Sequence, residues 1–168
     1  MNLLALAGIL SAIAMVIMAR YMRHAKTAEA VGSLNTLAQQ SASFYDASDA
    51  TQPVGSVPDA AHAMRHFPTS SLRTVPPSID DVRARRYQSA TADWIAPPWH
   101  ELGFSIPQPQ YYVYSYASEG SGTTAKATIT ARGDLDGDGL ESKFSITIAP
   151  DTAYRARIGA LKQEDTDE

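Results

Sequence analysis

Hydrophobic residues follow two successive patterns in the first third of the chain. Residues 3–19 read LLALAGILSAIAMVIMA, an apolar run without a charge, and basic residues follow it directly. From Tyr21 to Asp46 the apolar positions recur every three or four residues, which is the period of an amphipathic helix. Because no helix-stop signal separates the two patterns, the sequence predicts one continuous helix that makes residues 1–46 the N-terminal unit.

The apolar run at residues 3–19 has the composition of a transmembrane helix. A spanning helix needs about 20 apolar residues, with a lower limit near 17, and the run is close to that limit. A signal peptide fits less well, because no basic segment precedes the run and the helical pattern continues after it. We therefore predict a transmembrane half at 3–19 and an amphipathic half at 20–46, with a buried core helix as the other interpretation of the run.

Proline dominates the middle of the chain and excludes long regular elements there. Residues 47–109 hold nearly all of the prolines, and proline interrupts both helices and strands. We predict a loop region packed around four large apolar side chains: Trp94, Trp99, Leu102 and Phe104.

The last third of the chain alternates between apolar and polar residues, which is typical of strands. The predicted strands lie at 111–117, 124–131 and 142–149. They form an antiparallel β meander over residues 110–162, and an acidic tail follows at 163–168. The predicted fold class is therefore α+β, with a long N-terminal helix packed on a C-terminal antiparallel β-sheet.

Composition excludes several classes of function. The formal net charge of −4 argues against nucleic acid as the default partner. The chain has no cysteine, so neither a disulfide nor a cysteine metal site is expected. No nucleophile motif, P-loop or dinucleotide motif occurs in the sequence, and we do not expect an enzyme.

The sharpest local motif is the acidic segment at residues 133–139, GDLDGDG. Asp134, Asp136 and Asp138 alternate and are followed by glycine, as in the opening of an EF-hand calcium loop. The twelfth position of such a loop is Ser145 and not glutamate, and Glu141 is the nearest further carboxylate. Calcium bound by these four acidic residues is one interpretation, and an acidic hairpin turn is the other.

Two further groups of residues invite a functional interpretation. His62 and His66 have the helical i, i+4 spacing of metal ligands, but they lack the further ligand and base of a zinc site. Arg83, Arg85 and Arg86 form a basic cluster, for which a solvated face near neighbouring aspartates is the simpler interpretation.

Several motifs in their order along the chain resemble those of type IV pilins and pseudopilins. The segment Gly8 to Ala14 (GILSAIA) is similar to the family's G-I-L-A-A-I-A, and Arg23 to Ala30 is similar to its basic segment. Phe44 and Tyr45 match an aromatic pair near the helix end. One pilin subgroup continues with a tryptophan, L-G-F, a tyrosine-rich strand and G-D-L-D-G-D-G, here at Trp99, 102–104, 111–116 and 133–139.

This resemblance implies a structural subunit of a type IV pilus or related pseudopilus filament. It implies a chain that is anchored in the inner membrane before assembly, with its C-terminal domain in the periplasm or in an extracellular filament. Its partners are then other pilin-like subunits and the pilus assembly machinery. Small residues let helices approach closely, and the expected packing positions are Ala5, Gly8, Ser11, Ala12 and Ile13. The alternative is a membrane-tethered domain that does not polymerise.

The sequence departs from the pilin pattern at its start. No basic leader, no Gly-Phe processing site and no buried glutamate is present in it, and all three align upstream of Met1. Taken as written, Arg20 and Arg23 would also favour a cytoplasmic C-terminal domain. One hypothesis explains these departures together: Met1 is an internal methionine of a longer reading frame.

Overall fold

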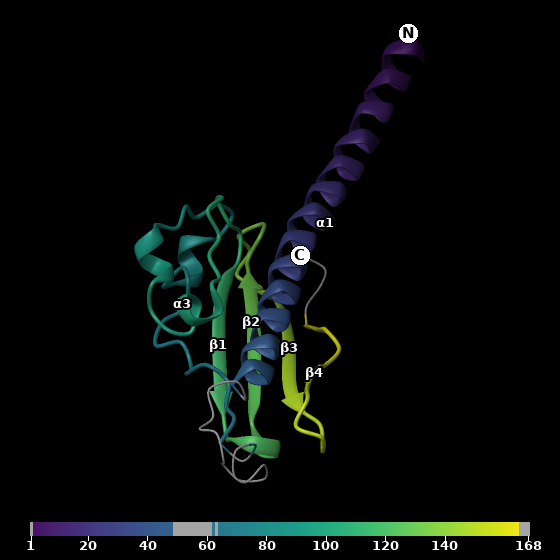
Figure 1. The fold of residues 1–168 in the computed structure, drawn as a ribbon. Helices are drawn as coiled ribbons and strands as arrows, with labels where there is room; N and C mark the ends of the chain where they lie inside the picture. Colours follow the sequence, from purple (N-terminus) through teal and green to yellow (C-terminus); the bar gives the residue numbers. More distant parts are fainter. Residues whose placement is uncertain (1, 49–61, 63, 165–168) are drawn as a thin grey trace.

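The computed structural model describes residues 2–48, 62 and 64–164. One long helix, α1 (Asn2–Ala47), precedes a β domain built from β1 (Val113–Glu119), β2 (Lys126–Gly133), β3 (Ser142–Pro150), β4 (Ala156–Ile158) and β5 (Lys162–Glu164). Between them lie a short helix, α3 (Trp99–Leu102), and two 3-10 helices, η1 (Ile79–Asp81) and η2 (Thr91–Trp94); a third, η3 (Gly122–Thr124), follows β1. Figure 1 shows α1 continuing well past the end of the sheet.

The sheet is antiparallel throughout and has the strand order β1-β2-β3-β4, with β5 paired to the same strand, β3, as β4. Its register places Tyr116 opposite Ile129 and Ile129 opposite Ile146. Because side chains alternate between the two faces of a strand, these residues lie on one buried face. The predicted strands thus agree with the observed ones to within about two residues, as strand boundaries usually do.

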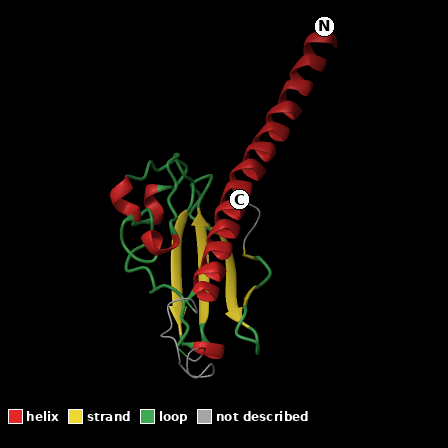
Figure 2. Cartoon of the chain, in the orientation of Figure 1, coloured by secondary structure: helices red, strands yellow, loops and turns green. Residues whose placement is uncertain are grey.

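The C-terminal half of α1 covers this buried face of the sheet (Figure 2). Leu34, Leu37, Ala38 and Tyr45 are fully buried there, at the three- and four-residue spacing of one helix face. Tyr45 also donates a hydrogen bond of 2.8 Å to the Gly122 carbonyl, 77 residues away in sequence. The end of α1 is therefore fixed to the sheet by both apolar packing and a buried hydrogen bond.

The predicted fold class is wrong in its account of the helix. Within residues 2–48, 62 and 64–164, no helix is long and apolar enough to cross a membrane. The run at 3–19 is near the lower length limit, and Arg20 ends it. Packing along the whole helix is also not seen, because the buried side chains described for α1 run from Ala30 to Tyr45. The α+β class and the antiparallel sheet remain.

The predicted boundary of the acidic tail also needs a correction. Gln163 and Glu164 belong to β5 and pair with β3, opposite Phe144 and Lys143. Lys143 holds Glu164 in an ion pair of 2.9 Å, which gives this acidic side chain a place at the sheet edge. Residues 165–168 lie outside the described part of the chain.

Four aromatic or apolar side chains anchor the proline-rich region, as predicted. Trp94, Trp99, Leu102 and Phe104 are all buried. The two indole rings meet edge to face with centroids 5.3 Å apart, and Phe104 joins them at 5.5 Å from Trp94. The Trp94 indole N–H donates to the Ser89 hydroxyl at 3.0 Å, so its one polar atom is satisfied inside the cluster.

A stripe of three tyrosines, Tyr112 just before β1 and Tyr114 and Tyr116 within it, belongs to the buried core. Tyr112, Tyr114 and Tyr116 are buried, in agreement with the predicted packed face. Burial raises the pKa of Tyr116 to about 12, and the nearby Ser41 hydroxyl of α1 works against this rise. Burial also raises the pKa of Tyr114. Both phenols are therefore held in the neutral form under the helix.

The β domain is expected to lose stability in alkali through Tyr116. Because folding raises this pKa from 10.0 to about 12, the contribution is complete below pH 10 and is lost as the pH rises towards about 12. The loss is on the order of 2 kcal/mol. Urea unfolding on both sides of this window measures it, and Tyr116→Phe, which cannot ionise, should lose less. An equal loss in both proteins would show that other groups cause the alkaline transition.

Candidate functional site

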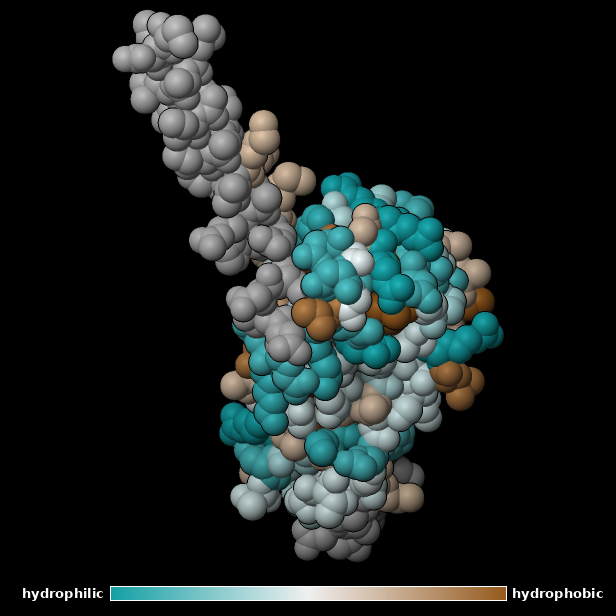
Figure 3. All heavy atoms as spheres, turned by 180° about the vertical axis from the view of Figure 1, so that it is seen from behind, coloured by the Kyte–Doolittle hydropathy of each residue, from teal (hydrophilic) through white to brown (hydrophobic). Residues whose placement is uncertain are grey.

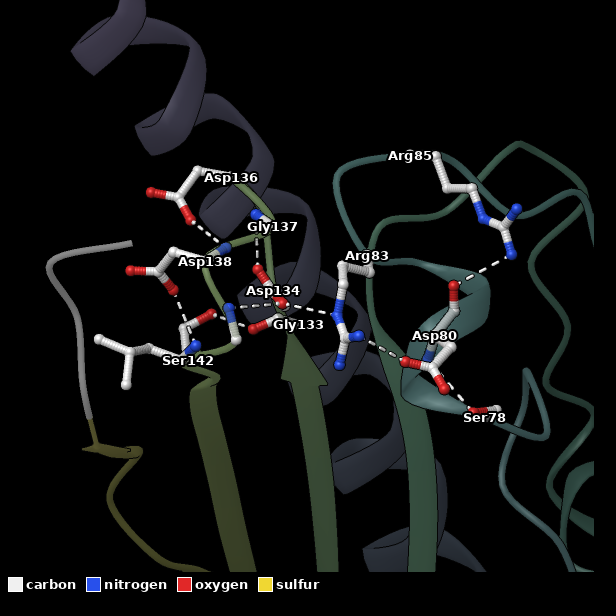
Figure 4. A network of polar contacts seen from close by, with 12 residues as sticks. Ser78, Asp80, Arg83, Arg85, Gly133, Asp134, Asp136, Gly137, Asp138 and Ser142 are labelled. Carbon is white, nitrogen blue, oxygen red and sulfur yellow. Dashed lines mark hydrogen bonds and ion pairs between the residues drawn. The ribbon is translucent and has the colours of Figure 1, made fainter.

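The acidic loop between β2 and β3 is built around one buried carboxylate. Asp134 is 0% exposed. Its Oδ1 accepts a hydrogen bond from the Gly137 N–H at 2.7 Å, and its Oδ2 accepts from the Gly139 N–H at 3.2 Å. The Arg83 Nε donates to the same Oδ2 at 3.0 Å (Figure 4). A single side chain thus satisfies two loop N–H groups and one cation.

The two other aspartates of the loop are exposed and cap their own turns. Asp136 Oδ1 accepts from the Asp138 N–H at 3.2 Å, and Asp138 Oδ1 accepts from the Leu140 N–H at 2.7 Å. Gly137 and Gly139 have φ angles of 85° and 92°, which only glycine adopts without strain. The alternating Asp and Gly residues are therefore what this backbone path requires.

The loop meets part of what a calcium site needs. Carboxylate oxygens of Asp134, Asp136 and Asp138 lie within 4.8 Å of one another. Glu141 does not join this group, since its carboxylate faces Arg132 at 3.5 Å. Calcium takes six to eight oxygen ligands, and Arg83 already occupies one oxygen of Asp134. The loop closes through its own hydrogen bonds, and calcium binding stays a prediction.

The basic cluster at 83–86 contributes to this loop in a way the sequence does not reveal. Arg83 bridges Asp134 and Asp80, the latter at 2.9 Å, and so joins the loop to η1 (Figure 4). Arg85 instead lies near Asp81, at 3.7 Å, as expected for a solvated face. The pair Arg83–Asp134 spans 51 residues, and local spacing carries no signal for such a contact.

The two histidines considered as metal ligands pack against aromatic rings. His62 stacks on Tyr154 with centroids 4.8 Å apart, and His66 meets Phe44 edge to face at 6.4 Å. The only acidic or histidine cluster with metal-ligand spacing among residues 2–48, 62 and 64–164 is that of the three aspartates. These contacts give both rings a packing role.

The predicted helix-packing positions lie on the part of α1 that extends beyond the sheet. Ala5, Gly8, Ser11, Ala12 and Ile13 belong to this helix, but their side chains are outside the described part of the chain. The next turns of α1 expose large apolar side chains: Met15 (71% exposed), Met18 (57%), Tyr21 (70%) and Met22 (49%). Figure 3 shows moderately hydrophobic residues above a domain surface that is mostly hydrophilic and carries scattered hydrophobic residues.

Comparison with known proteins finds no matching family model, no matching curated protein and no matching solved structure. The resemblance to type IV pilins therefore rests on the ordered sequence motifs alone.

Proposed function

We propose that this protein is a structural subunit of a type IV pilus or related pseudopilus filament, assembled through the N-terminal half of α1. The observation that carries the proposal is the run of large apolar side chains exposed on the projecting helix at Met15, Met18, Tyr21 and Met22. Exposing such a continuous apolar face to water is unfavourable. Packing against the same helix of other subunits would remove it from water.

The way in which the domain holds α1 supports the same role. Leu34, Leu37 and Tyr45 fix the C-terminal half of the helix against the sheet. The projecting half therefore leaves the domain in a defined direction (Figure 1). A filament subunit needs this fixed direction, because one repeated contact between identical subunits generates the helical array.

The proposal assigns a structural and not a catalytic role to the chain. Its partners are other pilin-like subunits and the machinery that assembles them. The β domain then lies in the periplasm or on the outer surface of an extracellular filament. The rival is a domain that does not polymerise, which the three converging aspartates would favour if they bind calcium.

Engineered cysteines test the proposal cleanly, because the chain has none of its own. A full-length chain with both Met15→Cys and Met22→Cys should form a ladder of cross-linked species on mild oxidation in cells that produce it. Two cysteines on one helix can bond to two neighbours, whereas Met18→Cys alone should give dimers. Denaturing gels without reductant measure both results.

The matched control carries two cysteines on exposed apolar positions of the β domain, Leu72→Cys and Leu140→Cys. These side chains are 92% and 65% exposed, compared with 71% and 49% for Met15 and Met22, so the control pair is on average the more accessible to the oxidant. The control should give no ladder under the same conditions. A Met15/Met22 variant that stays monomeric would reject assembly through α1 and favour the domain that does not polymerise.

A further inference from the structure

A groove of about 260 Å³ lies where α1 leaves the β domain. Met18, Tyr21 and Met22 of the helix form one part of its lining, and Lys26 and Glu29 continue it towards the domain. Arg86 and Tyr111 contribute from the domain side. The groove is therefore apolar at the end near the projecting helix and charged at the end near the sheet.

Two cations meet on one aromatic ring at the charged end of this groove. The Lys26 Nζ lies 4.5 Å from the centroid of the Tyr111 ring, and the Arg86 guanidinium carbon lies 4.9 Å from it. The Arg86 Nε also donates a hydrogen bond to the Tyr111 hydroxyl. Ring contacts of this kind orient both side chains, so two positive charges from two different segments of the chain are held against the same ring.

Glu29 is the carboxylate that lines the groove beside these cations. Its partial burial raises its pKa, and the positive charge of Arg86 works against this rise. With Glu29 ionised, the three charged side chains of the groove still sum to one positive charge. An anion entering the groove would gain from both cations and would be opposed by this one carboxylate.

We propose that the groove binds the phosphate headgroup of an anionic phospholipid, with the acyl chains lying along the exposed face of Met18, Tyr21 and Met22. Charge complementarity carries the choice of headgroup, because Lys26 and Arg86 both line the groove and both contact the Tyr111 ring. The apolar end carries the choice of a lipid over a soluble phosphate, since a free anion would leave three large apolar side chains in water. This surface contact needs no membrane-spanning helix and does not rest on filament assembly. It concerns the subunit outside a filament, because packing through α1 would cover the same three side chains.

Flotation of the full chain with lipid vesicles tests the proposal. Vesicles of phosphatidylcholine mixed with phosphatidylglycerol should retain more protein than vesicles of phosphatidylcholine alone. Lys26→Ala and Arg86→Ala should each lower partition onto the anionic vesicles about fivefold, with no change on the neutral ones. Glu29→Gln should raise partition onto the anionic vesicles, because it removes the one opposing charge.

Arg85→Ala is the matched control, because Arg85 is basic and exposed but faces Asp81 and not the groove. This variant should leave partition onto the anionic vesicles unchanged. If it lowers partition as much as Arg86→Ala does, the effect comes from net charge alone and the proposal is wrong. Competition by soluble glycerol phosphate would identify a free-anion site instead of a lipid site. If Arg86→Ala lowers self-association in sedimentation but not partition, a second copy of the chain occupies the groove and the proposal is wrong.

Discussion

Replacing Asp134 by alanine is expected to lower the free energy of unfolding by about 3 kcal/mol. The carboxylate is fully buried and accepts three hydrogen bonds, from Gly137, Gly139 and Arg83. Its removal leaves two loop N–H groups without their acceptor. Arg83 also loses its Asp134 partner. This loss costs less than in a fully buried ion pair, because Arg83 is about half exposed and also pairs with Asp80.

Urea denaturation of the three single alanine variants of the loop measures this effect. Asp136→Ala and Asp138→Ala should each cost about 1 kcal/mol or less, because these exposed side chains each cap one N–H group. Asp134→Asn keeps an acceptor oxygen and should recover part of the loss. The expected order therefore has Asp134 well apart from the other two.

A bound calcium ion would change that order. All three carboxylates would then act together, because losing any one breaks the ligand set. Millimolar calcium would raise the melting temperature of the parent protein, and each variant would lose the increase. Equal destabilisation by the three variants, seen only with calcium present, would contradict the purely structural interpretation of the loop and support the cation site.

Local patterns in the sequence are sufficient for the long helix and for β1, β2 and β3, but not for the short strands β4 and β5. The alternation around Ile129 and Ile146 predicts the strands and their buried face, and the spacing of Leu34, Leu37 and Ala38 predicts the buried side of the helix. Both depend on short-range periodicity, which is fixed by backbone geometry. The alternating aspartates and glycines likewise place a tight connection between two strands.

The contacts that give the sites their character are not local. Arg83 meets Asp134 across 51 residues, and Arg86 meets Tyr111 across 25. Arg83 also pairs with Asp80, and Arg85 pairs with Asp81, at local helical spacing. No spacing rule predicts the distant partners of Arg83 and Arg86. The helix also differs from its prediction, because among residues 2–48, 62 and 64–164 no helix is long and apolar enough to cross a membrane.

Substitutions in the two halves of α1 are expected to have different effects. Those in the C-terminal half should lower the stability of the domain, and those in the projecting half should weaken assembly. Leu37→Ala should lower the free energy of unfolding by about 3 kcal/mol, because it removes a fully buried side chain and leaves a cavity between helix and sheet. Met18→Ala lies on the exposed face of the projecting half and should change stability by no more than about 0.5 kcal/mol. Thermal or urea unfolding of the two variants gives this comparison.

Self-association should respond in the opposite way if the projecting helix is the assembly surface. Met18→Ala combined with Met22→Ala removes two exposed apolar side chains and should weaken subunit association at least tenfold. Leu37→Ala should leave association of the folded fraction unchanged, because Leu37 faces the sheet of its own chain. Sedimentation across a concentration series measures both. A double methionine variant that associates as strongly as the parent protein would place the contact elsewhere and remove the main support for a filament built through α1.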